Sequence, residues 1–264
     1  MASKHGTVAE LARAFRHWLA GWWGIVRLGA QLLEMALTPS TYSGENWRNL
    51  AQHIVQDTAP LLAGFTVITT LISLIVIRIV LVTAVSYGLT QYALEMVVRV
   101  LVLELIPLTA ALFAALRCTV PNAAEIAALR AQGAWAASTG AGTDVLRREV
   151  LPRVASGVFT ALLLAAVSCA VTLVVAYLSV YGPVTSGLAA YTRTVGHVFN
   201  PAVSIILGLK IMFLGVAVAL VPAAAVLDEA PARRRRASAE LQGLVRMFLV
   251  ILLIEATSLV GNYY

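Results

Sequence analysis

Charged residues and the residue types of catalytic or metal sites are scarce in this sequence. Asp, Glu, Lys and Arg make up 12% of the 264 residues, hydrophobic residues make up 60%, and the mean hydropathy is +0.85. The two cysteines, Cys118 and Cys169, and the four histidines follow no disulfide or metal-ligand spacing. No Gly-x-x-x-x-Gly-Lys-Ser/Thr loop is present, so another subunit would have to bind any ATP that is used. This composition excludes a soluble globular domain.

Long apolar stretches separated by short connections account for most of the chain. A helix that crosses a bilayer needs about 20 predominantly apolar residues, and five stretches meet this requirement. They predict an all-α integral membrane protein with transmembrane spans at residues 58–86, 96–117, 154–181, 201–227 and 244–262. No room is left for a separate soluble domain, so residues 1–264 are expected to form one domain.

Basic residues are concentrated on alternate connections, and this predicts the orientation of the chain. The region before the first span, the connection at 118–153 and the connection before the last span are rich in arginine, whereas the other two connections hold only Arg99 and Arg193. By the positive-inside rule, the N-terminus lies in the cytoplasm and the C-terminus on the far side. The net charge of +6 is therefore mainly a topology signal. The arginines at 233–236 favour contact with anionic lipid head groups over nucleic-acid binding.

Residues 8–37 are too polar to cross the bilayer, yet their apolar residues recur at three- and four-residue steps. Trp18, Trp22 and Trp23 suit the head-group boundary, and Arg13 and Arg27 lie off the apolar stripe. We expect an amphipathic helix that lies flat on the cytoplasmic leaflet. A signal peptide is excluded because no long apolar core precedes a small-residue cleavage site.

Four charged residues, Arg78, Glu104, Lys210 and Glu255, fall inside the predicted spans. An unpaired ion at bilayer depth costs at least about 2.5–3.5 kcal/mol, so these positions are candidates for function. Two charges of each sign allow complete internal pairing. Three interpretations remain open: salt bridges that fix helix packing, a polar route or gate that rearranges during transport, and a proton relay through Glu104 beside Pro107.

The connection at 118–153 has the composition of folded structure. Residues 122–135 predict an Ala-rich helix, residues 138–142 a flexible break, and Thr143 or Asp144 the cap of a second short helix that ends before Pro152. A structured cytoplasmic insert suggests a docking surface for a partner. The alternative is a helical hairpin with no partner.

At this connection the sequence begins to resemble the MlaE (YrbE-type) permeases. The segment LELIPLTAAL at 103–112 is similar to the Glu-Leu-x-Pro segment of that family, Arg117 falls on the Arg of its Ala-Gly-Arg motif, and Ala-Glu-Ile at 124–126 matches its Ala-Glu-Ile/Leu. Further similarities follow in the family's order: Gly142-x-Asp144-x-x-Arg147, Leu151-Pro152-Arg153, Gly208-Leu209-Lys210, and Glu255 where the last span carries Asp.

The resemblance implies the membrane subunit of an ABC lipid transporter in the bacterial inner membrane, with its C-terminus in the periplasm. Two permease copies would pair as a homodimer or heterodimer. An ABC ATPase would dock on the cytoplasmic face through a coupling helix between the second and third spans, and an MCE substrate-binding protein would sit on the opposite face. The cargo would be phospholipid or another hydrophobic lipid. The chain itself would perform no catalysis and bind no metal or cofactor, because ATP is held by the partner.

The resemblance also implies where function is carried. An intramembrane polar network is expected from Arg78, Glu104, Arg117, Lys210 and Glu255. Movement of the ATPase would act on residues 122–148. The residues expected to take part in this coupling region are Glu125, Arg130, Asp144, Arg147 and Arg148.

Some positions depart from the family pattern. Leu116 replaces the Gly of Ala-Gly-Arg, Ile106 replaces a Gly after Glu-Leu, and the coupling segment at 131–142 lacks the usual acidic residues. This is consistent with a co-adapted ATPase, or with a non-transporting scaffold that forms half of a heteromeric permease. A secondary transporter coupled to protons through Glu104 or Glu255 is the other alternative, although no internal repeat supports it.

Overall fold

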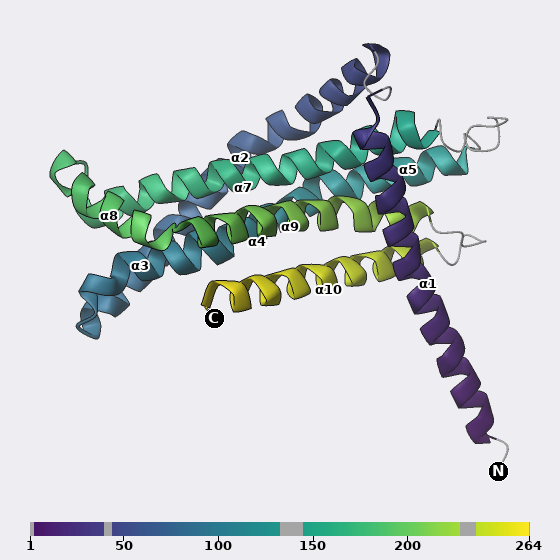
Figure 1. Ribbon diagram of the computed structural model, residues 1–264, viewed down its shortest axis with the longest axis horizontal. Helices are drawn as coiled ribbons and strands as arrows, with labels where there is room; N and C mark the ends of the chain where they lie inside the picture. The colour runs from purple at the N-terminus through teal and green to yellow at the C-terminus, as the bar shows by residue number, and fades with distance from the viewer. Residues whose placement is uncertain (1–2, 40–43, 133–144, 228–235, 264) are drawn as a thin grey trace.

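The structure is a computed structural model that describes residues 3–39, 44–132, 145–227 and 236–263, and within these ranges every element is helical (Figure 1). The elements are α1 (Ser3–Leu37), α2 (Gly44–Ser86), η2 (Thr90–Tyr92), α3 (Ala93–Val97), η3 (Val98–Leu105), α4 (Ile106–Ala114), η4 (Ala115–Thr119), α5 (Val120–Ala131), η5 (Leu146–Val150), α7 (Leu151–Tyr181), η6 (Thr185–Gly187), α8 (Leu188–Val198), α9 (Pro201–Leu227) and α10 (Arg236–Tyr263).

Five helical stretches of the described chain are long and apolar enough to cross a membrane: Asn46–Ser86, Ala93–Ala131, Leu146–Tyr181, Pro201–Leu227 and Leu241–Asn262. This agrees with the predicted all-helical membrane protein. The helix α2, which contains the first predicted span, begins at Gly44, well before residue 58, where that span was expected to start. The treatment of residues 1–264 as a single domain stays a prediction.

The second stretch is one continuous helix, made of α3, η3, α4, η4 and α5. Two of these segments, η3 and η4, are π-helical, and so is η5 at the start of the next stretch. A proline stands at the second residue after each of them: Pro107, Pro121 and Pro152. A proline ring clashes with the carbonyl group four residues earlier in an α-helix, and a wider π turn gives the ring room.

The helix that holds the second span continues past residue 117, through η4 and Pro121 into α5, and the residue at which the span itself ends stays a prediction. One predicted helix end is wrong. The short helix expected to end before Pro152 continues through that residue into α7, because η5 accommodates the ring. The predicted break at 138–142 and the predicted cap at Thr143 or Asp144 lie outside the described residues.

The helices α7 and α9 lie at the centre of the bundle. α7 packs against α2, α4 and α9, and α9 packs against α5 and α10. α5 and the starts of α7 and α10 lie at one end of the molecule, whereas α3 and α8 lie at the other (Figure 1). α1 crosses α9, and its Ile25, Leu28 and Leu32 are buried there while Trp23 is exposed. Its position on a membrane surface stays a prediction.

Buried hydroxyl groups join α2 to α7 along their contact. Thr58 and Thr160 lie 2.8 Å apart at their Oγ1 atoms, Thr69 Oγ1 donates to Ser168 Oγ at 3.4 Å, and Ser73 Oγ and Thr172 Oγ1 lie 2.9 Å apart. Small hydroxyl residues allow two membrane helices to approach closely, and each hydroxyl group finds its hydrogen-bond partner on the other helix.

The helix α8 was not predicted from the sequence. Its Tyr191 is buried against the rings of Tyr177 and Tyr181, and its hydroxyl donates to the carbonyl oxygen of Leu173 at 2.7 Å. Burial raises the pKa of Tyr191 to about 12. The aromatic contacts fold α8 back onto the end of α7.

Gly157 of α7 gives a test of the central packing. A methyl group at this position would lie 2.6 Å from Thr119 Cγ2 and 3.2 Å from Ala219 Cβ. Gly157→Ala should lower the free energy of unfolding by about 1–3 kcal/mol, measured by thermal denaturation in detergent. Gly64→Ala is the control, because nothing lies within 4 Å of its added methyl group and Ala favours a helix. Equal melting temperatures for the two variants would contradict this packing.

Candidate functional site

A buried lysine on α9 joins acidic residues of two other helices. Lys210 is 2% exposed. Its Nζ donates to Glu255 Oε1 of α10 at 2.9 Å, to the Leu103 carbonyl oxygen of η3 at 3.0 Å, and to Glu104 Oε2 of η3. All three donors of the ammonium group are thus used. Asn262 of α10 adds a bond from Nδ2 to Glu104 Oε1 at 3.2 Å. We call Lys210, Glu104, Glu255 and Asn262 the Lys210 cluster.

The charges of the Lys210 cluster do not balance when every group is ionised, because two carboxylates share one ammonium. The ammonium is the most deeply buried of the three groups. A buried ion pair stabilises a fold weakly, but loss of one partner leaves a costly unpaired charge. The cluster can therefore fix η3, α9 and α10 relative to one another, or change its pairing when one of these helices moves.

One side of α10 brings further polar atoms to the cluster. Glu255, Ser258 and Asn262 recur at three- and four-residue steps, so they share a helix face. Glu255 Oε2, Ser258 Oγ and Asn262 Oδ1 are buried and have no hydrogen-bond partner among the described residues. The cluster thus has unused hydrogen-bonding capacity, as expected where a polar group or another pairing is accommodated.

Two members of the expected intramembrane network lie elsewhere. Arg78 is exposed on α2 and Arg117 is exposed on η4, and neither forms an ion pair or hydrogen bond with the Lys210 cluster. Of the five residues assigned to that network, the structure brings together Glu104, Lys210 and Glu255.

The residues expected in the coupling region lie at one end of the bundle. Glu125 of α5 pairs with Arg153 of α7 at 3.3 Å, and Arg130 Nη1 donates to the Val226 carbonyl oxygen of α9 at 3.0 Å. Arg147 is partly buried in η5, and Arg148 is exposed. Asp144 lies outside the described residues. Their role toward an ATPase stays a prediction.

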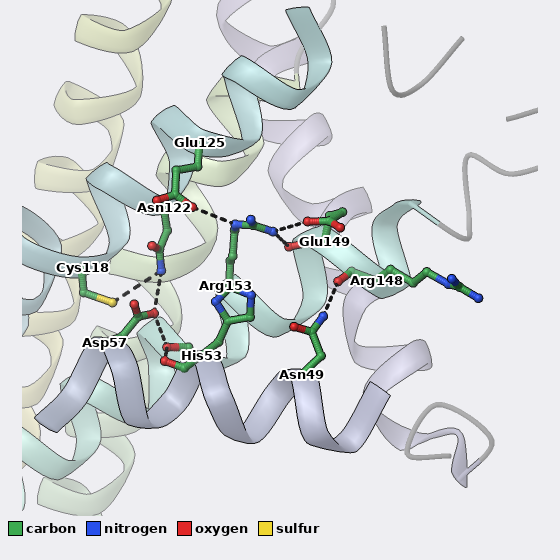
Figure 2. A network of polar contacts seen from close by, with 10 residues as sticks. Asn49, His53, Asp57, Cys118, Asn122, Glu125, Arg148, Glu149 and Arg153 are labelled. Atoms are coloured by element: carbon green, nitrogen blue, oxygen red, sulfur yellow. Dashed lines mark hydrogen bonds and ion pairs between the residues drawn. The ribbon is translucent and has the colours of Figure 1, made fainter. Parts of the chain in front are cut away.

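Sequence reasoning missed a polar network around Asp57 at the same end (Figure 2). Asp57 Oδ2 accepts hydrogen bonds from Asn122 Nδ2 of α5, at 2.9 Å, and from Ser156 Oγ of α7. Asp57 was overlooked because the first span was expected to begin one residue later. The signal that could have found it is an acidic residue directly before a long apolar run, where a carboxylate needs partners on neighbouring helices.

An apolar cavity of about 140 Å³ lies between α5, α9 and α10. It is lined by Val120, Ala123, Ala124, Pro222, Ala225, Val226, Gly243 and Leu244. Within the described ranges, no group of three or more His, Cys, Asp or Glu residues could hold a metal ion.

Removal of the ammonium tests the electrostatic account of the cluster. Lys210→Met should lower the free energy of unfolding by about 3–5 kcal/mol, because two carboxylates are left buried together. Combining this change with Glu104→Gln and Glu255→Gln should recover much of the loss. The control is Arg193→Met on α8, which removes an exposed arginine outside the candidate spans and should change stability by less than about 0.5 kcal/mol. Thermal denaturation that fails to separate Lys210→Met from Arg193→Met would contradict the account.

Comparison with known proteins identifies the family. The family model described as Permease MlaE matches residues 50–260. The match begins in α2 and ends in α10, so it includes Glu104, Lys210 and Glu255. No curated protein matches the chain. Since the family match covers most of the sequence, this chain belongs to the MlaE permease family and is a multi-pass membrane subunit of a transporter.

Proposed function

We propose that this chain is the permease subunit of an ABC-type transporter that moves phospholipid between the bacterial inner membrane and an extracytoplasmic MCE protein. The observation that carries the proposal is the match to the MlaE permease family over residues 50–260. ATP would be hydrolysed by a partner ATPase, because the sequence has no phosphate-binding loop. Two permease copies would pair, as a homodimer or a heterodimer, to enclose a lipid.

The distribution of basic residues supports a cytoplasmic docking end. Arg130 at the end of α5, Arg147 and Arg148 in η5, and Arg153 at the start of α7 lie at the same end of the bundle (Figure 1). The positive-inside rule puts this end in the cytoplasm. An ATPase would dock there, around residues 122–148, and the MCE protein would face the end that holds α8.

The surface of the bundle supports an apolar cargo. α2 and α10 expose stripes of large apolar side chains, which include Leu71 and Leu74 on α2 and Leu252 and Leu253 on α10. In a pair of permeases, such faces could line a path for acyl chains. The Lys210 cluster would hold the bundle in one arrangement and change its pairing during the transport cycle.

A proton-coupled secondary transporter is the second candidate, and one observation favours it. Glu104 and Glu255 share one ammonium, so the Lys210 cluster could take up a proton without leaving a buried charge unpaired. A non-transporting scaffold is the third candidate, and it would tolerate substitution in the cluster provided that packing survives.

Purification of the tagged chain from its native host in mild detergent tests the assignment. We expect mass spectrometry to find an ABC ATPase, an MCE protein and phospholipid in the eluate. In vesicles, lipid transfer by this complex should require ATP and should resist an uncoupler of the proton gradient. Transfer that stops with the uncoupler and ignores ATP would favour the secondary transporter. Reproducible absence of both partners would overturn the ABC assignment.

Glu104→Gln separates a transporter from a scaffold. Lipid transfer should fall on the order of tenfold while the complex still assembles, because a hydrogen bond to a buried charge is worth about 1.5–3 kcal/mol. Glu95→Gln is the matched control on the same continuous helix, since Glu95 forms a partly exposed pair with Arg99. Equal transfer by the two variants would favour the scaffold.

A further inference from the structure

Asp57 stands where α2, α5 and α7 meet. Its Oδ2 atom accepts one hydrogen bond from Asn122 of α5 and another from Ser156 of α7 (Figure 2). The Asn122 amide also lies 3.7 Å from Cys118 Sγ, and the Ser156 hydroxyl lies 3.2 Å from the His53 carbonyl oxygen. One carboxylate oxygen of α2 thus connects α5 and α7, through side chains that lie 65 and 99 positions away from Asp57 in the sequence.

Further polar contacts close the triangle of helices. Arg153 of α7 pairs with Glu125 of α5 at 3.3 Å and with Glu149 of η5 at 2.6 Å, which joins α5 to the start of the third span. Asn49 Nδ2 of α2 donates to the Arg148 carbonyl oxygen at 3.1 Å. Each pair of the three helices therefore has its own polar contact, and α2, α5 and η5 with α7 are held as one unit at this end.

The packing of α2 against α7 does not require a charged side chain. Farther along the same contact, neutral hydroxyl pairs such as Ser73 with Thr172 hold these two helices together. Ionised Asp57 costs more to desolvate than a hydroxyl group, and its hydrogen-bond donors, Asn122 and Ser156, are neutral. What the carboxylate adds is a strong acceptor with enough lone pairs to hold α5 and α7 at the same time.

The helices held by Asp57 border the segment expected to meet the ATPase. α5 ends at Ala131 and η5 begins at Leu146, so both flanks of residues 133–144 connect to α2 through this network. Beyond the network, α2 continues along the bundle and exposes an apolar face that includes Leu71, Leu74 and Ile75. Motion of the coupling region must therefore move α2, unless the contacts around Asp57 break.

We infer that Asp57 is a positioning residue that transmits movement of the coupling region to the lipid-facing helix α2. The inference rests on the proposed function, in which an ATPase acts on residues 122–148. It predicts that loss of the carboxylate separates ATP hydrolysis from lipid transfer, whereas loss of packing at the same helix contact does not.

The first test compares two variants of α2 in the intact complex with its ATPase. Asp57→Ala should retain most of the ATP hydrolysis, while lipid transferred per ATP hydrolysed falls about tenfold. Ser73→Ala is the matched control, because it removes a buried hydrogen bond between α2 and α7 without touching α5. It should lower the melting temperature and leave the ratio of transfer to hydrolysis unchanged. The same ratio in both variants would overturn the inference, as would parallel loss of hydrolysis and transfer after Asp57→Ala.

A swap of the two side chains adds a rescue test. The double variant Asp57→Asn with Asn122→Asp keeps an amide and a carboxylate facing each other across α2 and α5. It should recover most of the ratio that Asp57→Ala loses. Failure of the swap in a complex that remains folded would show that the α2 to α5 hydrogen bond is not the transmitting contact.

A third measurement does not depend on cargo or on ATP. Hydrogen–deuterium exchange of the full chain in detergent should show faster exchange in both α5 and the first turns of α2 after Asp57→Ala. Ser73→Ala should leave α5 unchanged. If the wild-type complex moves no lipid but this exchange pattern is found, the proposed function fails while the mechanical link stands. Unchanged exchange in α5 after Asp57→Ala would overturn the link itself.

Discussion

The ammonium of Lys210 sets the strongest constraint on this bundle. Much of the protein faces lipid, where a charge has no water to compensate it, so the group must find its partners on other helices. Leu103, Glu104 and Glu255 supply them from η3 and α10. This fixes how η3, α9 and α10 are rotated about their own axes, because the ammonium makes all three hydrogen bonds only when the acceptors on η3 and α10 face it.

Polar side chains elsewhere also find their hydrogen-bond partners on other helices, and neutral hydroxyl groups cost less free energy to bury than an ammonium. The hydroxyl pairs of α2 and α7 run along the contact of these two helices, from Thr58 beside Asp57 to Ser73. Apolar side chains such as Leu71 and Leu252 remain on the outside, where lipid solvates them. The interior of the bundle is thus marked by hydrogen bonding as much as by hydrophobicity, and each polar contact specifies which helix faces which.

Five spans could be predicted from the sequence because an apolar run of sufficient length has one outcome in a bilayer. The cost of a charge at bilayer depth also pointed to Glu104, Lys210 and Glu255. The same reasoning failed for Arg78 and Arg117. Whether a charged side chain meets a partner depends on the direction in which it faces around its helix, and the predicted start and end of a span do not give that direction. Asp57 was missed for the opposite reason: it lies next to an expected boundary, and the helix runs past that boundary.

The π turns give the second stretch an unusual relation between length and direction. A π turn takes up one more residue than an α turn, and each residue of an α-helix advances about 100° around the axis. Loss of one residue from an α-helical segment would turn everything after it by that angle. Loss of one residue within Val98–Leu105 would instead convert the π segment toward α, so Ala110 and Ala114 would keep their places in the core. A π turn thus absorbs a change in length that would act as a rotation elsewhere in the helix.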